Sequence, residues 1–144
     1  MKIIIPVCLV LVILLLSCGK DEPVNFEAFN PEAFAFDLGD MWEVNASVRV
    51  KGFMQNKDEN TNQFSASIQY AVDLKKPNGD IEPDKFKFTF EPVKEEKFMD
   101  LGLDDVQFEL DSSYEEGIYT VMFRIKDLIS GSETSTTVEV ELNK

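Results

Sequence analysis

Acidic side chains are the main chemical groups that this sequence offers. Its 144 residues include 27 Asp and Glu, two Cys and no His. Adjacent carboxylates such as Asp104–Asp105 and Glu115–Glu116 could supply the acid and base of glycoside hydrolysis, but among 27 acids such pairs arise by chance. The commonest general base is missing and no Gly-x-Ser-x-Gly elbow occurs. We therefore expect that this protein is not an enzyme.

Calcium is the metal that acidic loops could bind, because it prefers oxygen ligands. The two candidate loops are residues 80–84 and 100–105. Neither has the spacing of the twelve-residue EF-hand loop. We expect solvated acidic loops, no metal site and no cofactor, with calcium binding as the alternative.

The overall composition limits the partners and the architecture. The net charge of −13 argues against nucleic-acid binding, which needs a basic face. The chain is 44% apolar and contains twelve Phe, which is enough for one core of ordinary size. At this length a single domain is expected.

The N-terminus carries an apolar segment too short to cross a bilayer. Met1-Lys2 precedes an uncharged run of fourteen residues, 3–16. As a helix this run would span roughly 21 Å, against about 30 Å of hydrocarbon. An apolar run of this length that follows a single Lys predicts a secretory signal peptide over residues 1–17. The alternative is a short membrane anchor.

The apolar run ends in Leu15-Leu16-Ser17-Cys18, which closely resembles the lipobox of bacterial lipoproteins. The resemblance implies that a diacylglyceryl group is attached to the Cys18 thiol and that a peptidase cuts between Ser17 and Cys18. The new amino group is then usually acylated as well. Two or three acyl chains anchor a protein durably, whereas one does so only marginally. The partner implied for the N-terminus is thus a membrane, bound through lipid on Cys18.

Lys20-Asp21-Glu22, just after the lipobox Cys, resembles the export signal of Bacteroidota lipoproteins. This resemblance implies an outer-membrane protein that faces the cell exterior. The alternative is a polar tether of arbitrary sequence. In either case we expect residues 18–32 to be a flexible tether, since they carry two Pro, several acids and no settled period.

Alternation with a period of two dominates the remainder, residues 33–144. Apolar and polar residues alternate in seven segments, which predict strands at 34–38, 44–50, 64–74, 86–90, 106–110, 119–125 and 138–142. Most Phe are expected in the core. Asn30-Pro31-Glu32 could instead start a helix, but the strand is favoured. Turn residues such as Asn78-Gly79 separate the segments. The predicted fold is all-β, a single antiparallel β-sandwich of about seven strands.

Gly117 and Tyr119 add detail to this fold. A Gly two residues before a Tyr, at the start of the penultimate strand, resembles the tyrosine corner of immunoglobulin-like sandwiches. Residues 108–142 resemble the closing strands of bacterial immunoglobulin-like and fibronectin-like accessory domains. The resemblance implies that the Tyr119 hydroxyl bonds to backbone a few residues upstream. The alternative is an ordinary core Tyr.

Alternating strands would gather three loops at the end of the domain far from the tether. These loops are residues 39–42, 75–84 and 111–116, and an extra strand at 95–99 would break the arrangement. Trp42 would either stack on a sugar or cover the end of the core, and the core position is favoured. The possible binding pole comprises Asp40, Trp42, Asp80, Glu82, Asp84, Asp111, Glu115 and Glu116.

The expected function is therefore that of a non-enzymatic, surface-exposed outer-membrane lipoprotein. It would present an immunoglobulin-like binding or accessory module to a protein or glycan partner. The alternative is a periplasm-facing lipoprotein that acts in envelope assembly or inhibits a protease.

Overall fold

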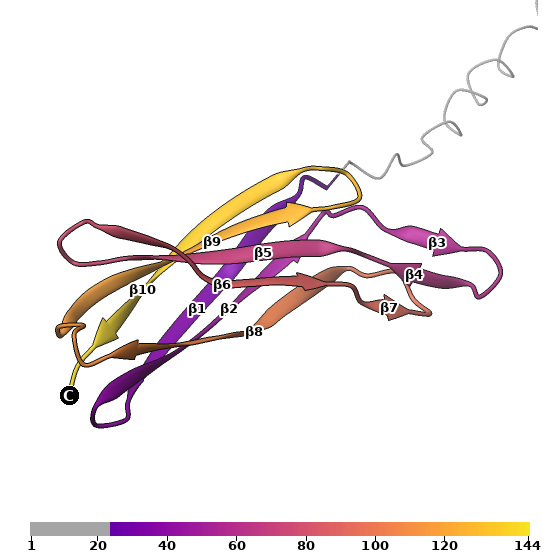
Figure 1. The fold of residues 1–144 in the computed structure, drawn as a ribbon. Coiled ribbons are helices and arrows are strands. Elements are labelled where there is room, and N and C mark those ends of the chain that lie inside the picture. Colours follow the sequence, from indigo (N-terminus) through magenta and orange to yellow (C-terminus); the bar gives the residue numbers. More distant parts are fainter. Residues whose placement is uncertain (1–23) are drawn as a thin grey trace, which may run out of the picture.

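The computed structural model describes residues 24–144, apart from the side chain of Asp105, and this part of the chain is all-β (Figure 1). Residues 24–144 contain no helix, and hence none that could span a membrane. The strands are β1 (Glu27–Asp37), β2 (Met41–Lys51), β3 (Asn56–Asp58), β4 (Gln63–Ser65), β5 (Ile68–Lys75), β6 (Ile81–Phe90), β7 (Val93–Lys94), β8 (Asp100–Asp111), β9 (Gly117–Asp127) and β10 (Glu133–Leu142).

All strand pairs are antiparallel, as predicted, and they form three sheets. The seven long strands make up two of them, in the orders β1-β2-β8 and β10-β9-β5-β6. The short strands β3, β4 and β7 form the third. The prediction of about seven strands thus fits the two larger sheets and missed the small one.

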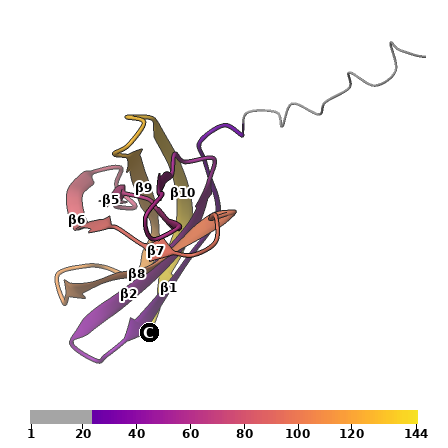
Figure 2. The ribbon, with the colours of Figure 1, turned by 90° about the vertical axis from the view of Figure 1, so that its right-hand side faces the viewer.

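The two larger sheets enclose one apolar core. Strands β2, β8 and β9 bury alternate side chains, because successive residues of a strand point to opposite faces. Strand β5 is instead buried on both faces from Tyr70 to Leu74. The strands β1 and β10 lie side by side at one edge. Figure 2 shows the strands from the side, with β5 and β6 set apart from β1 and β2. The largest fully buried side chains are Tyr70, Phe123, Ile68, Leu74, Leu103, Leu110 and Leu142.

Strand β1 differs from the sequence prediction in its start and in its orientation. It begins at Glu27, inside the range expected to be tether. It passes through Asn30-Pro31 as a bulge, with Asn30 at a φ of +48°, so the helix considered there is absent. Bulges admit an extra residue while the pairing continues on both sides. The tether boundary at residue 32 is therefore too late.

The side chains of β1 that face the core are small. Ala33 and Ala35 pack against it, whereas Phe34 is 60% exposed and Phe36 is 53% exposed. The predicted alternation is present, but the Phe side chains point outward rather than inward. Because β1 lies against β10 where the two sheets meet, only small side chains fit on its inner face.

The small third sheet arises from a segment expected to be a loop. Residues 55–63 are polar throughout, yet β3 pairs with β4, which also pairs with β7. The predicted strand 64–74 is consequently divided at Ala66-Ser67, where the Ala66 N–H donates to the Pro92 carbonyl. Strand β3 is exposed on all three residues, so its sequence carries no apolar alternation.

Candidate functional site

The three loops predicted to share one end of the domain do lie together. They are the β1–β2 turn, the β5–β6 hairpin and the β8–β9 loop, and the end they form is named the distal pole. It lies on the left of Figure 1, opposite the N-terminal start of the coloured chain. The segment 95–99 is not a strand, and β7 lies at the other end, so it does not shift these loops.

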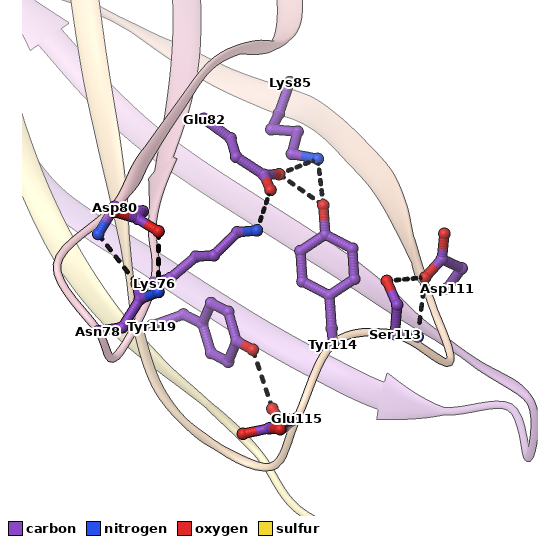
Figure 3. A network of polar contacts seen from close by, with 10 residues as sticks. All are labelled: Lys76, Asn78, Asp80, Glu82, Lys85, Asp111, Ser113, Tyr114, Glu115 and Tyr119. Atoms are coloured by element: carbon purple, nitrogen blue, oxygen red, sulfur yellow. Dashed lines mark hydrogen bonds and ion pairs between the residues drawn. The ribbon is translucent and has the colours of Figure 1, made fainter.

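The β5–β6 hairpin has the turn predicted from Asn78-Gly79. Gly79 adopts a φ of +94°, and its N–H donates to the Lys76 carbonyl over 2.9 Å. The Lys76 N–H in turn donates to the Asp80 carbonyl over 2.8 Å. The Asn78 and Asp80 side chains are hydrogen-bonded to each other. This local network fixes the shape of the hairpin tip, which lies beside the β8–β9 loop (Figure 3).

A polar network of four side chains joins the hairpin to that loop. The Glu82 carboxylate contacts the ammonium groups of Lys76 and Lys85 and accepts a hydrogen bond from the Tyr114 hydroxyl. Lys85 Nζ also donates to Tyr114 Oη over 2.6 Å. Both ammonium groups lie about 5 Å from the centre of the Tyr114 ring, at 5.1 Å and 5.0 Å. Figure 3 shows the Glu82 carboxylate between the two ammonium groups, with the Tyr114 hydroxyl beside it.

The network keeps its groups charged at neutral pH. Burial raises the pKa of Glu82, but hydrogen bonds from Lys76, Lys85 and Tyr114 outweigh it and lower the pKa to about 2. The hydrogen bond to Glu82 raises the pKa of Lys76. Burial lowers the pKa of Lys85, yet its bonds to Glu82 and Tyr114 produce a net increase. A carboxylate so strongly ionised is poorly suited to general acid or base catalysis. The geometry is that of a clamp between two loops.

Tyr119 makes the contact that a tyrosine corner would make. Its side chain is buried, and its hydroxyl donates to the Glu115 backbone carbonyl over 2.9 Å. Burial raises the pKa of Tyr119, which keeps the hydroxyl protonated as a donor. Gly117 has a φ of +149°, and a Cβ there would lie 3.1 Å from Pro77 Cγ. Gly117 therefore lets the hairpin approach the loop closely.

Two shallow hollows flank the β8–β9 loop. The first, of about 510 Å³, lies toward the β5–β6 hairpin, and the second, of about 440 Å³, lies toward the β1–β2 turn. Lys76 and Asn78 line the first hollow. Asp37 and Asp40 line the second. Tyr114, Glu115 and Glu116 line both. A ligand at the pole would thus meet the same loop from either side.

The predicted pole residues have different environments. Asp40, Glu115 and Glu116 are exposed and border the hollows. Trp42 is only 3% exposed, so it covers the end of the core and is not a free stacking surface. Asp111 accepts hydrogen bonds from the Ser113 backbone and side chain, which lower the pKa of Asp111.

Two of the predicted acids are neutralised by cations. Glu82 lies between two lysines, as described above. Asp84 pairs with Arg124 at 2.7 Å and belongs to a cluster with Asp73 on the outer face of β5, β6 and β9, away from the two hollows. The pole is therefore less acidic than the sequence indicated. The sequence reasoning missed Lys76, Lys85 and Tyr114, which are separated along the chain and meet only in the fold.

The acids of the two calcium candidate loops do not converge. Asp80 bonds to Asn78, Glu82 to lysines and Asp84 to Arg124. In the loop of residues 100–105, Asp100 pairs with Arg49. No group of three or more potential metal ligands is found among the described side chains.

The predicted signal peptide and anchor lie outside the described residues. This applies to the cleavage site between Ser17 and Cys18, the lipid on Cys18 and the export signal Lys20-Asp21-Glu22. No protein-family model matches the chain, and no significant match is found among curated proteins.

Proposed function

We propose that this protein is a non-enzymatic lipoprotein of the bacterial outer membrane that presents an immunoglobulin-like binding module to the cell exterior. The lipobox ending in Ser17-Cys18 and the following Lys20-Asp21-Glu22 support the location. Two facing antiparallel sheets with seven long strands, together with the hydrogen bond from Tyr119 to Glu115, support the fold type. The resemblance to immunoglobulin-like domains supports the fold type but does not identify the partner, because one fold can serve many functions.

The position of the distal pole is the main observation that supports the proposal. Its loops lie opposite the N-terminal start of the coloured chain, which belongs to the predicted tether (Figure 1). A domain anchored through Cys18 would hold this end away from the membrane. Loops supported by a rigid sheet scaffold are where binding residues are commonly found. Tyr114, Glu115 and Glu116, which border both hollows, are the proposed centre of the binding surface.

Protease treatment of intact cells tests the location. The native chain is expected to be cleaved by an added protease while a periplasmic marker stays intact. A Cys18→Ser variant is expected to lose the membrane-bound fraction and the fatty-acid mass, because it has no thiol to acylate. Protection of the native chain until the outer membrane is broken would favour the periplasm-facing alternative. Intact mass spectrometry showing no fatty acid would contradict the anchor itself.

A pair of charge-matched variants tests the pole. Glu115→Gln combined with Glu116→Gln is expected to reduce cross-linking to the native partner by about tenfold, since these side chains border both hollows. Glu139→Gln combined with Glu141→Gln is the control, because it makes the same charge change on exposed positions of β10. Equal loss in both variants would indicate a net-charge effect, and no loss in the first would exclude the pole.

A further inference from the structure

The outer face of the sheet β1-β2-β8 carries two exposed aromatic rings. Phe34 is 60% exposed and Phe36 is 53% exposed, and both are on β1. Residues two apart on a strand point to the same side, about 7 Å from each other. Neither ring is in contact with another aromatic ring within the described part of the chain. Exposed apolar groups rimmed by polar residues are typical of binding surfaces.

Hydrogen-bonding side chains form two columns beside these rings. In the strand register, Phe36 is level with Glu43 and Glu109, and Phe34 is level with Asn45 and Gln107. Asn45 Nδ2 donates to Glu43 Oε1 over 2.8 Å, which orients both side chains along β2. A shallow hollow of about 260 Å³ adjoins Phe34, with Asn45, Ser47 and Asp104 among its lining residues. The face therefore combines an apolar edge with an amide- and carboxylate-rich floor.

The charge of this face selects among possible occupants. The groups around the rings are acidic, with Glu32, Glu43 and Glu109 on the three strands. The cations of the same face, Arg49 and Lys51, are paired with Asp100 and Glu27. A second copy of the same face would therefore bring like charges together, as would an anionic lipid surface or an acidic polymer. The occupant should therefore carry no net negative charge.

We propose that this face binds a neutral polysaccharide, independently of the distal pole. A sugar ring is apolar on its C–H face and carries hydroxyl groups around its edge, which matches this combination of groups. Phe34 and Phe36 stack on sugar rings, and the side chains of Glu43, Asn45, Gln107 and Glu109 exchange hydrogen bonds with the hydroxyls. Carboxylates accept such bonds, and amides both donate and accept them.

Affinity gel electrophoresis of the full chain tests this proposal. The gels contain one soluble polysaccharide each: an α-glucan, a β-1,3-glucan, a xylan, a mannan, or the anionic polygalacturonate. At least one neutral polysaccharide is expected to retard the native protein, and polygalacturonate is not. Phe34→Ala combined with Phe36→Ala should weaken the binding by about tenfold. Phe88→Ala is the control, since Phe88 is 47% exposed on the other sheet and its loss should leave binding within about twofold.

Further variants keep the test decisive if the double Ala variant folds poorly. Phe34→Tyr combined with Phe36→Tyr should retain binding, because the rings remain. Gln107→Ala, at an exposed position of β8, should weaken it by about threefold through a lost hydrogen bond. The proposal is overturned if no neutral polysaccharide retards the protein, if only polygalacturonate does, or if both Gln107→Ala and the double Ala variant bind normally. It is also overturned if the native chain is a dimer that the double Ala variant converts to monomer.

Discussion

Asp127→Ala is expected to destabilise the domain by about 3 kcal/mol in urea unfolding at pH 7. Asp127 is fully buried at the end of β9. Its carboxylate accepts hydrogen bonds from the backbone N–H groups of Met54 and Ile129 over 2.8 and 2.9 Å, and from the Ser130 hydroxyl over 2.6 Å. The first of these bonds ties the segment after β2 to the β9–β10 turn.

The Asp127 carboxylate is ionised in spite of its burial. Burial raises its pKa, but hydrogen bonds from Met54, Ser130 and Ile129 outweigh this and produce a net decrease. Truncation leaves these donors facing an empty volume, and an unsatisfied donor costs about 1–3 kcal/mol. Asp127→Asn is expected to recover less than half of the loss, because its amide N–H₂ would face one of the N–H donors.

An exposed Asp at another turn provides the matched control for Asp127. Asp37 accepts one hydrogen bond, from the Gly39 N–H over 2.7 Å, and it is solvent-exposed. Asp37→Ala is therefore expected to change the unfolding free energy by about 0.5 kcal/mol or less. If Asp127→Ala lost no more stability than Asp37→Ala, the buried Asp127 carboxylate would have no special role in stabilising the domain.

Periodicity predicted most of the long strands but could not assign their faces. Val44 and Val48 are buried as their alternation indicates. In β1 the same pattern was misleading, because the inner face is occupied by Ala33 and Ala35 and the larger Phe34 and Phe36 point outward. Alternation defines two faces of a strand, and the space left by the opposing sheet decides which one is buried. That space depends on the contact between β1 and β10, which are about a hundred residues apart along the chain.

The candidate site was predictable in its location and not in its chemistry. Turn residues such as Asn78-Gly79 located the loops, and strand order then brought them to one pole. The pairing of Glu82 with Lys76 and Lys85 depends on the bulge in β6, where Asp84 has a φ of +52° and the register with β5 shifts. A bulge re-aims the side chains on either side of it. Nothing in the sequence indicates that β6 has a bulge at this point, so the shift in register could not be predicted.

The stabilisation contributed by Glu82 is expected to disappear in acid. Its pKa is about 2 in the folded protein against 4.5 as the ordinary value. Glu82 is therefore protonated more readily in the unfolded chain than in the folded protein. Its contribution to the free energy of unfolding is complete above pH 4.5 and is lost as the pH falls toward 2. A shift of this size corresponds to at most about 3 kcal/mol, and since part of the carboxylate is in contact with water, about 2 kcal/mol is expected.

A comparison of Glu82→Gln with the native chain isolates this contribution. At pH 7 the variant should be about 2 kcal/mol less stable, because Lys76 and Lys85 then lie close together without their counter-charge. The difference should shrink as the pH is lowered from 5 to 2, as measured by urea unfolding at each pH. Glu139→Gln is the control, since Glu139 is exposed and its side chain forms no hydrogen bond or ion pair in the described part of the chain.

The same variant separates the stability of the pole from its binding role. Glu82 joins the β5–β6 hairpin to Tyr114, and Tyr114 borders both hollows. If the clamp shapes the binding surface, Glu82→Gln should weaken partner cross-linking at pH 7 while the domain remains folded, and faster amide exchange should be confined to residues 76–82 and 112–116. A difference in stability that did not vary with pH would show that Glu82 is not held ionised by the two lysines, and the clamp would have to be abandoned.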